Sequence, residues 1–195
     1  MGFLKDNCIF SVFDENVLLN VAAFHCGDDD LDDFFQNEAI AYSHQLLGKS
    51  YCFRLEKHPE VIVCAFTVAN ASMRVDHLPN ARKKKIIKNI PHIKEHKSYP
   101  AVLVGRLGVN MDYQSNHIGH ELMNFIKSWF VDPLNKTGCR FIVVDAYNNE
   151  KTISYYRQNN FDLVFTTEQQ ECMALGLLEE VLHTRFMYFD LITIC

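Results

Sequence analysis

The sequence predicts an α/β (α+β) fold in which a mixed sheet of six to seven strands is flanked by helices. Apolar, β-branched runs of strand length alternate along the chain with amphipathic segments of helical spacing. Nearly half of the 195 residues are apolar (48%), and phenylalanine and tyrosine are plentiful. Because this length and composition suit one ordinary hydrophobic core, we expect a single domain over residues 1–195.

Strands are expected where apolar runs are bounded by turn residues. Near the N-terminus there are two such runs, 9–13 and 17–24, and at least the second is predicted to be a strand. The remaining strand candidates are residues 51–55, 61–69, 101–109, 140–146, 161–165 and 185–194. Helices are expected from the acidic capping residues 28–30 to Gly48, over 118–131, and between 166 and 184.

Charge and cysteine usage restrict the function classes. The formal net charge of −5 argues against a surface built throughout for nucleic acid. One basic stretch, residues 82–97, is read either as a solvated helix face or as a contact for RNA backbone or cofactor phosphates. Its cations, set against the single acid Glu95, are Arg82, Lys83, Lys84, Lys85, Lys88, Lys94 and Lys97.

The seven cysteines show no zinc-finger or redox spacing, which indicates reduced thiols in a cytoplasmic protein. There is no basic-then-apolar leader and no apolar run of membrane-spanning length, so no membrane association is expected. No metal site is expected either. The acidic run 28–30 is interpreted as a helix cap, and the histidine pairs His92/His96 and His117/His120 lack a third ligand.

The most informative stretch runs from residue 99 to residue 130 and reads as strand, polar loop and helix. The free amides of a helix's first turn carry partial positive charge and can hold a phosphate group. On the residues alone, an ordinary strand-turn-helix remains the other interpretation. The loop consists of Gln114, Ser115, Asn116, His117, Ile118, Gly119 and His120.

These seven residues resemble the pyrophosphate-binding loop of the GCN5-related N-acetyltransferase family, in which Gln or Arg is followed by a glycine-rich turn. His117 stands in the place of the first glycine and His120 in that of the second small residue, while Gly119 matches the glycine that commonly lies between them. Histidine and asparagine accept left-handed backbone more readily than most residues, which suits the changed positions.

A second stretch is similar to another signature of the same family. Asn149 falls on its asparagine, Thr152 on its small residue, Tyr156 on its tyrosine and Phe161 on its final phenylalanine. Asn160 takes the glycine position, where left-handed backbone ends a helix. The two signatures lie in the family's order, and together they cover roughly residues 99–165.

The resemblance implies the acyl-CoA N-acyltransferase fold over the whole chain, with a mostly antiparallel sheet splayed at its central strands and an antiparallel pair of final strands. It implies acetyl-CoA as acyl donor and no metal. The implied cofactor contacts are the backbone of Leu107, Gly108 and Val109 for the pantetheine arm, the amides of Gln114 to His120 for the diphosphate, and Asn149 for the arm.

Tyr156 is the implied general acid, since an unperturbed phenol is protonated at neutral pH and can give its proton to a thiolate. The alternative for Tyr156 is a core aromatic, and Tyr155 is expected to pack. No residue is identified as the general base, for which a water chain serves equally well.

The predicted function is an acetyl-CoA-dependent N-acetyltransferase that moves the acetyl group directly to a primary amine. The amine belongs to a small molecule, a peptide or an aminoacyl-tRNA. The last acceptor goes with the toxin-type branch, whose members pair with a small antitoxin. This branch is resembled by three segments, namely residues 24–35, the basic stretch, and residues 99–100 followed by 105–109. A homodimer is a further expected partner. The other class considered is a non-catalytic protein that binds acyl-CoA or a partner.

Overall fold

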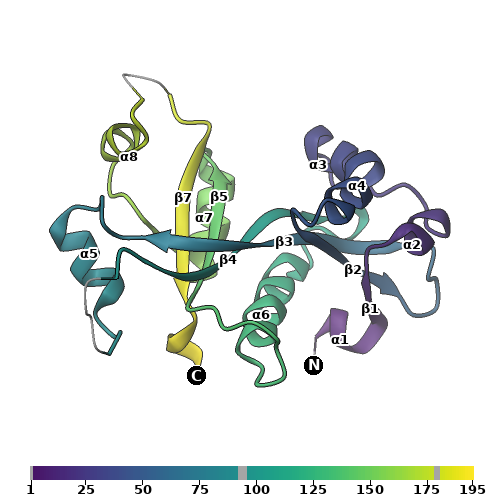
Figure 1. The fold of residues 1–195 in the computed structure, drawn as a ribbon. Coiled ribbons are helices and arrows are strands. Elements are labelled where there is room, and N and C mark those ends of the chain that lie inside the picture. The colour runs from purple at the N-terminus through teal and green to yellow at the C-terminus, as the bar shows by residue number, and fades with distance from the viewer. Residues whose placement is uncertain (1, 92–95, 178–180) are drawn as a thin grey trace. The chain divides into compact units, whose positions relative to one another are not determined.

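The computed structural model describes residues 2–91, 96–177 and 181–195, and its strands form one seven-stranded sheet in the order β1-β2-β3-β4-β5-β7-β6 (Figure 1). The registered pairs are antiparallel for β1–β2, β2–β3, β5–β7 and β6–β7, and parallel for β4–β5. The prediction of a mixed, mostly antiparallel sheet flanked by helices is confirmed. The chain divides into two compact units, residues 1–70 with 104–128 and residues 71–103 with 129–195.

The first unit has helices on both faces of its part of the sheet. Its strands are β1 (Cys8–Val12), β2 (Lys49–Leu55) and the first part of β3 (Ile62–Arg74). Its helical segments are α1 (Phe3–Asn7), α2 (Glu15–Leu19), α3 (Asp29–Asp33), a π-helical turn (Phe34–Glu38), α4 (Ala39–His44) and α6 (Ile118–Val131), which ends in the second unit.

Alternation along β2 and β3 divides the apolar side chains of this unit between the two faces. Cys52 and Ala65 pack with Phe34 and Phe35 in the core below α3 and α4. On the opposite face, Phe53 and Phe10 of β1 contact Phe125 of α6, with ring centroids 4.9 and 4.8 Å apart. The sheet is therefore covered on both sides, as the apolar run of β3 predicts.

The second unit is built around β5 and β7. It holds the first part of β4 (Ser98–Val109), β5 (Phe141–Tyr147), β6 (Asp162–Leu163), β7 (Thr184–Asp190), α5 (Asn80–Ile87), α7 (Glu150–Gln158), α8 (Glu168–Leu175) and a final 3-10 turn (Leu191–Ile194). Ile86 and Ile87 of α5 join the core that contains Phe141 and Tyr188. At the end of α7, Phe161 packs on Phe189 of β7 with ring centroids 5.7 Å apart.

Two local predictions are wrong. Residues 17–24 do not form a strand: α2 occupies 15–19, because the Asp14 carboxylate accepts the Val17 amide at 2.9 Å and caps a helix there, while the neighbouring run forms β1. Gly48 does not terminate the helix before β2, which ends at His44. Leu46 takes the left-handed conformation (φ +59°), and a side chain at Gly48 would collide with Tyr42 at 2.6 Å.

The other predicted segments agree closely with the structure. The helix expected over 118–131 is α6, and the expected antiparallel pair of final strands is β6 and β7, although β6 has only two residues. All seven cysteines are free. Among the described residues, no helix combines the length and apolar character that crossing a bilayer requires. The expected splay between the central strands stays a prediction, because the end of β4 and the strand β5 belong to different units.

Candidate functional site

The turn between β4 and α6 combines a strand end, a short 3-10 helix (Met111–Tyr113) and two left-handed residues that are not glycine. Ser115 and His117 have φ of +65° and +59°, and α6 begins at the next residue, Ile118. Successive amides beside left-handed residues can form an anion-binding concavity. Residues 114–117 are exposed, so this turn is accessible to a ligand.

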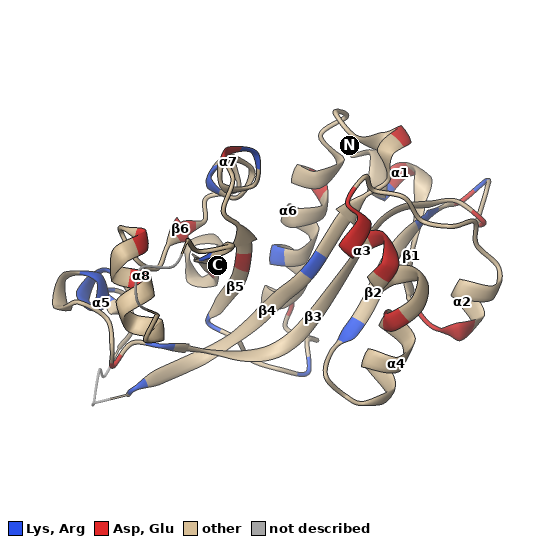
Figure 2. Ribbon diagram, turned by 90° about the horizontal axis from the view of Figure 1, so that it is seen from above, with Lys and Arg blue, Asp and Glu red and all other residues tan. Residues whose placement is uncertain are grey.

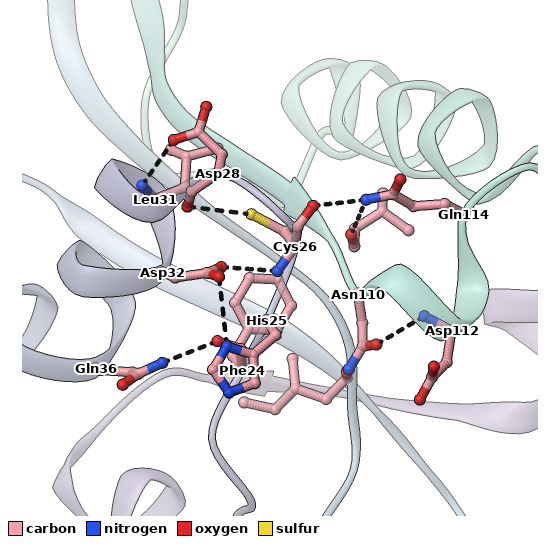
Figure 3. Close-up of polar contacts among 12 residues, drawn as sticks. Phe24, His25, Cys26, Asp28, Leu31, Asp32, Gln36, Asn110, Asp112 and Gln114 are labelled. Atoms are coloured by element: carbon pink, nitrogen blue, oxygen red, sulfur yellow. Dashed lines mark hydrogen bonds and ion pairs between the residues drawn. The ribbon is translucent and has the colours of Figure 1, made fainter.

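The side chain of Gln114 fixes the start of this turn. Its Nε2 donates to the carbonyl oxygen of Cys26 at 2.7 Å and to that of Val109 at 3.0 Å (Figure 3). The carbonyl of Val109, one of the expected contacts for the pantetheine arm, is therefore already engaged by the protein. The backbone groups left for a ligand here are chiefly amides.

Asn110 ties the end of β4 to the start of β3. Its amide donates to Val63 at 2.9 Å, its Nδ2 donates to Ile62 at 3.0 Å, and its Oδ1 accepts the Asp112 amide at 3.0 Å. These three bonds hold the strand end in place independently of any ligand. The turn is consequently preorganised on its amino-terminal side.

Gly108 allows another segment of the protein to approach β4. A Cβ built on Gly108 would lie 3.1 Å from both the Cys26 thiol and the Phe24 ring. Residues 24–26 therefore lie against the strand end that the family resemblance assigns to the acyl donor. The absence of a side chain at Gly108 is what permits this close approach.

In the second unit, Asn149 and Tyr156 both belong to α7, Asn149 at its start and Tyr156 near its end. Asn149 is the N-cap of this helix, and its Oδ1 accepts the Thr152 amide at 2.8 Å. Its amide NH2 is the group that can still donate to a cofactor. Asn160 adopts φ +61° at the end of α7, as expected for the residue in the glycine position.

Tyr156 is buried, with 8% of its surface exposed, and its ring makes edge contacts with Tyr155 at 5.1 Å and Phe161 at 5.3 Å. Desolvation, reinforced by the charge of Asp145, raises the pKa of its phenol well above 10. The phenol therefore stays protonated across the physiological range, as a proton donor must. The aromatic contacts also fit the alternative role of a core side chain.

A cavity of about 340 Å³ lies along the outer side of α7, beside β6 and β7. Its lining includes Asn149, Ser154 and Arg157 from the helix and Arg185 from β7. Arg185 is buried and donates to Glu171 at 2.7 Å, so its charge is already balanced. Tyr156 does not line this cavity.

The sequence argument missed a polar cluster in the first unit, between residues 24–26 and α3. Asp32 accepts the Cys26 amide at 2.7 Å through one carboxylate oxygen, and its other oxygen lies 3.4 Å from Nδ1 of His25 (Figure 3). Asp28 caps α3 by accepting the Leu31 amide at 3.1 Å, as predicted. His25 and Asp32 are only seven residues apart, on the two sides of the turn before α3, but no motif in the sequence marked them as a pair.

The basic stretch is partly a helix face. Its described part includes α5, where Lys85 pairs with Asp162 at 2.7 Å and Arg82 donates to the carbonyls of Leu163 and Val164. His92, Lys94 and Glu95 lie outside the described residues. Within the part of the chain that the structure describes, no group of three or more His, Cys, Asp or Glu side chains could hold a metal.

The donor set of the β4–α6 turn fits the diphosphate of an acyl-CoA. It offers solvent-facing amides, left-handed residues and the first turn of a fourteen-residue helix, a combination that suits a phosphate ester. Contacts to the adenine or the acyl group are not assigned.

No protein-family model and no curated protein matches the sequence. Solved structures do match over nearly the full length. A tyrosine-to-phenylalanine mutant of KacT has a TM-score of 0.70 and 17% identity, covering 97% of this chain and 98% of that chain. AtaT complexed with acetyl-methionyl-tRNAfMet has a TM-score of 0.66 and 18% identity, covering 96% and 97%. AtaTR bound with AcCoA has a TM-score of 0.62 and 16% identity, covering 97% and 96%.

At these identities the likeness establishes the fold. The chain has the GCN5-related N-acetyltransferase fold of the KacT and AtaT toxins, as the two signatures predict.

Proposed function

We propose that this chain, which has the GCN5-related N-acetyltransferase fold, transfers an acetyl group from acetyl-CoA to a primary amine. The observation that carries the proposal is the β4–α6 turn, where left-handed Ser115 and His117 precede α6. When bound, acetyl-CoA supplies the activated acetyl group as a thioester. The chain's own residues bind it, orient it and manage the protons.

The proposed roles are those that the family resemblance implies for these residues. The amides of Leu107 to Val109 bind the pantetheine arm, and one of them donates to the oxyanion that develops on the thioester oxygen. The amides of residues 114–120 hold the diphosphate. Asn149 donates its NH2 to the arm while its Oδ1 caps α7. Tyr156 gives its proton to the departing thiolate.

The protonation state of the Cys26 thiol supports direct transfer of the acetyl group to the amine over a route through an acetylated cysteine. Its thiol lies against Gly108, at the strand end assigned to the acyl donor. Desolvation by burial, followed by a hydrogen bond with Asp32, raises the pKa of the Cys26 thiol to about 12. Because the nucleophile in thiol chemistry is the thiolate, Cys26 is unreactive at neutral pH.

Calorimetry with acetyl-CoA, followed by a thiol-release assay over a panel of amines and charged tRNA, tests the proposal. We expect binding, turnover with at least one acceptor, and a strong loss of turnover in Tyr156→Phe. Binding without turnover on any acceptor, and no change for Tyr156→Phe, would instead favour a non-catalytic acyl-CoA-binding or partner-binding protein.

A narrower version of the proposal has the amine of an aminoacyl-tRNA as acceptor. One of the similar structures is AtaT with an acetylated methionyl-tRNA. In this chain, Figure 2 shows a concentration of Lys and Arg on α5. Lys84 and Lys88 are exposed there, and lysines on a helix face can contact an RNA backbone.

The salt dependence of tRNA binding tests this narrower version. Each lysine that contacts a phosphate contributes about 0.7–0.9 to the slope of log affinity against log salt. We therefore expect Lys84→Ala with Lys88→Ala to flatten that slope by up to about 1.8. Lys57→Ala, an exposed lysine in the β2–β3 turn, is the control and should leave it unchanged. An unchanged slope in the double variant would reject the contact.

The toxin-type reading includes a small antitoxin as partner. Another similar structure is an AtaT mutant bound to the C-terminus of the antitoxin AtaR. We expect expression of this chain alone to arrest growth, and Tyr156→Phe to relieve the arrest. A gene neighbour that encodes a small DNA-binding protein and restores growth on co-expression would support this partner. The proposed homodimer is tested by sedimentation of the purified chain.

A further inference from the structure

We propose that His25, held by Asp32, accepts the proton of the attacking amine, which supplies the general base that the sequence did not identify. This inference rests on the proposed function. His25 would be a catalytic residue, because it touches the acceptor, and Asp32 would be the residue that positions it.

The geometry of the pair fits this division of roles. Asp32 is itself fixed: one carboxylate oxygen accepts the Cys26 amide at 2.7 Å, and the other lies 3.4 Å from Nδ1 of His25. The His25 side chain is 63% exposed, while that of Asp32 is only 14% exposed. When a carboxylate engages Nδ1, the opposite nitrogen, Nε2, is the atom that accepts a proton. Figure 3 shows this pairing beside the end of β4.

The place of His25 in the fold links it to the acyl donor. Its carbonyl oxygen accepts the Met111 amide at 3.0 Å, two residues after the strand end at Val109. Its neighbours Phe24 and Cys26 both lie within 3.1 Å of a Cβ built on Gly108. An amine that attacks a thioester bound along residues 107–109 therefore approaches a strand end to which the backbone of His25 is hydrogen-bonded.

The proton balance of the step is complete. As the amine attacks the carbonyl carbon, the C–N bond forms and the N–H proton passes to Nε2 of His25. The C–S bond breaks, and its electron pair leaves with the sulfur, which takes the proton that Tyr156 donates. Water then removes the proton from His25 and returns one to the Tyr156 oxygen. No oxidant or further reactant is needed.

The charges around the pair favour an ionised Asp32. Desolvation opposes its ionisation, but hydrogen bonds from Cys26 and the interaction with His25 outweigh this and lower the pKa of the Asp32 carboxyl. A negative charge beside the ring stabilises the imidazolium that forms when the proton is accepted. Other charged groups on the surrounding elements are Asp28, Asp29, Asp30 and Asp33 of the α3 region, Arg106 of β4, which pairs with Asp30 at 3.8 Å, and Asp112 after β4.

The alternative is that the pair is an ordinary surface contact. Exposed ion pairs of this kind contribute little to stability, typically under about 1 kcal/mol. The chain provides a matched example: Nε2 of His44 lies 3.6 Å from Glu15, and the His44 side chain is 67% exposed. His44 is the last residue of α4, shortly before β2, and serves as the control.

The test measures kcat and KM for thiol release in the wild type, His25→Gln, Asp32→Asn and His44→Gln, with the acceptor that the amine panel identifies. His25→Gln should lose about 10²-fold or more in kcat, with little change in the KM for acetyl-CoA, because the attacking amine loses its proton acceptor. His44→Gln should behave as the wild type.

Asp32→Asn should lower kcat with little change in the KM for acetyl-CoA, because an amide does not stabilise the imidazolium that forms during the step. A purely structural role for Asp32 would instead change KM or folding and leave kcat unchanged. Added imidazole should restore part of the activity of His25→Ala. Acetyl-CoA binding, measured by calorimetry in each variant, confirms that the variants fold.

The outcomes separate the two proposals. Turnover in the wild type, with a loss in kcat below about threefold in His25→Gln, would overturn the role of His25 and leave the proposed function intact. No turnover of the wild type on any acceptor would overturn the proposed function and the role of His25 together.

Discussion

The β4–α6 turn and helix α7 each carry one signature of the same fold, yet they differ in what they present. The turn is exposed and consists mainly of oriented backbone, with left-handed Ser115 and His117. Helix α7 is capped, and its key side chain, Tyr156, is buried. Substitutions in the turn should therefore act through backbone conformation and ligand binding, whereas substitutions in α7 should act through stability or chemistry.

The largest effect is expected where α7 packs. Phe161 is 3% exposed and contacts the rings of Tyr156 and Phe189 at 5.3 and 5.7 Å. Phe161→Ala should lower the free energy of unfolding by about 3–5 kcal/mol, because it leaves a cavity in the core. Urea denaturation measures this loss. The matched change beside the turn, His120→Ala at an exposed position in the first turn of α6, should cost less than about 0.5 kcal/mol. Similar losses of stability for Phe161→Ala and His120→Ala would contradict the expected difference between α7 and the turn.

Tyr156→Phe separates chemistry from packing within α7. It keeps the buried ring and removes only the proton donor, so kcat should fall about 10²-fold or more, while the free energy of unfolding changes by about 1 kcal/mol. Thiol release and urea denaturation on the same preparation give the two numbers. A loss of stability with unchanged kcat would show that Tyr156 is only a core aromatic.

His117→Val tests whether conformation matters in the turn. A β-branched residue at φ +59° costs about 1–2 kcal/mol, so the dissociation constant for acetyl-CoA should rise about 5–30-fold. His117→Gly, which accepts this conformation freely, should bind at least as well as the wild type. Calorimetry compares the two. If His117→Gly bound as weakly as His117→Val, the imidazole side chain and not the backbone would be responsible.

The smallest effect concerns the two functions of Asn149. Asn149→Ala should cost about 1 kcal/mol of stability, because the Thr152 amide loses its cap. Asn149→Asp keeps an acceptor for that amide and should retain the stability, but it removes the NH2 donor and should weaken acetyl-CoA binding. Thermal unfolding and calorimetry distinguish the two functions. Equal binding by Asn149→Asp and the wild type would remove Asn149 from the cofactor site.

Strong local signals in the sequence predicted much of this structure. The apolar spacing from residue 118 onward and the stop at Pro133 gave α6 its observed bounds, since periodicity and a helix breaker are properties of the chain itself. The left-handed conformations of His117 and Asn160 were also anticipated from residue type. Near the N-terminus, the capping bond of Asp14 outweighed the apolar run and produced α2, which apolar composition alone could not predict.

The His25–Asp32 pair could not be predicted for a different reason. Asp32 lies within a run of acids that reads as a helix cap, and Asp28 in that run does cap α3. Only the approach of residues 24–26 to Gly108 places His25 beside the strand end. Contacts of this kind are set by packing between segments far apart in the chain, which leave no periodic pattern in the sequence.

Titration of acetyl-CoA into the ¹⁵N-labelled chain, followed by amide chemical shifts, tests the central claim most directly. If the backbone between β4 and α6 holds the cofactor, the amides of residues 115–120 should shift most, and those of residues 107–109 should shift with them. Saturable binding that leaves the amides of 115–120 unmoved, or no binding at millimolar acetyl-CoA, would contradict the account.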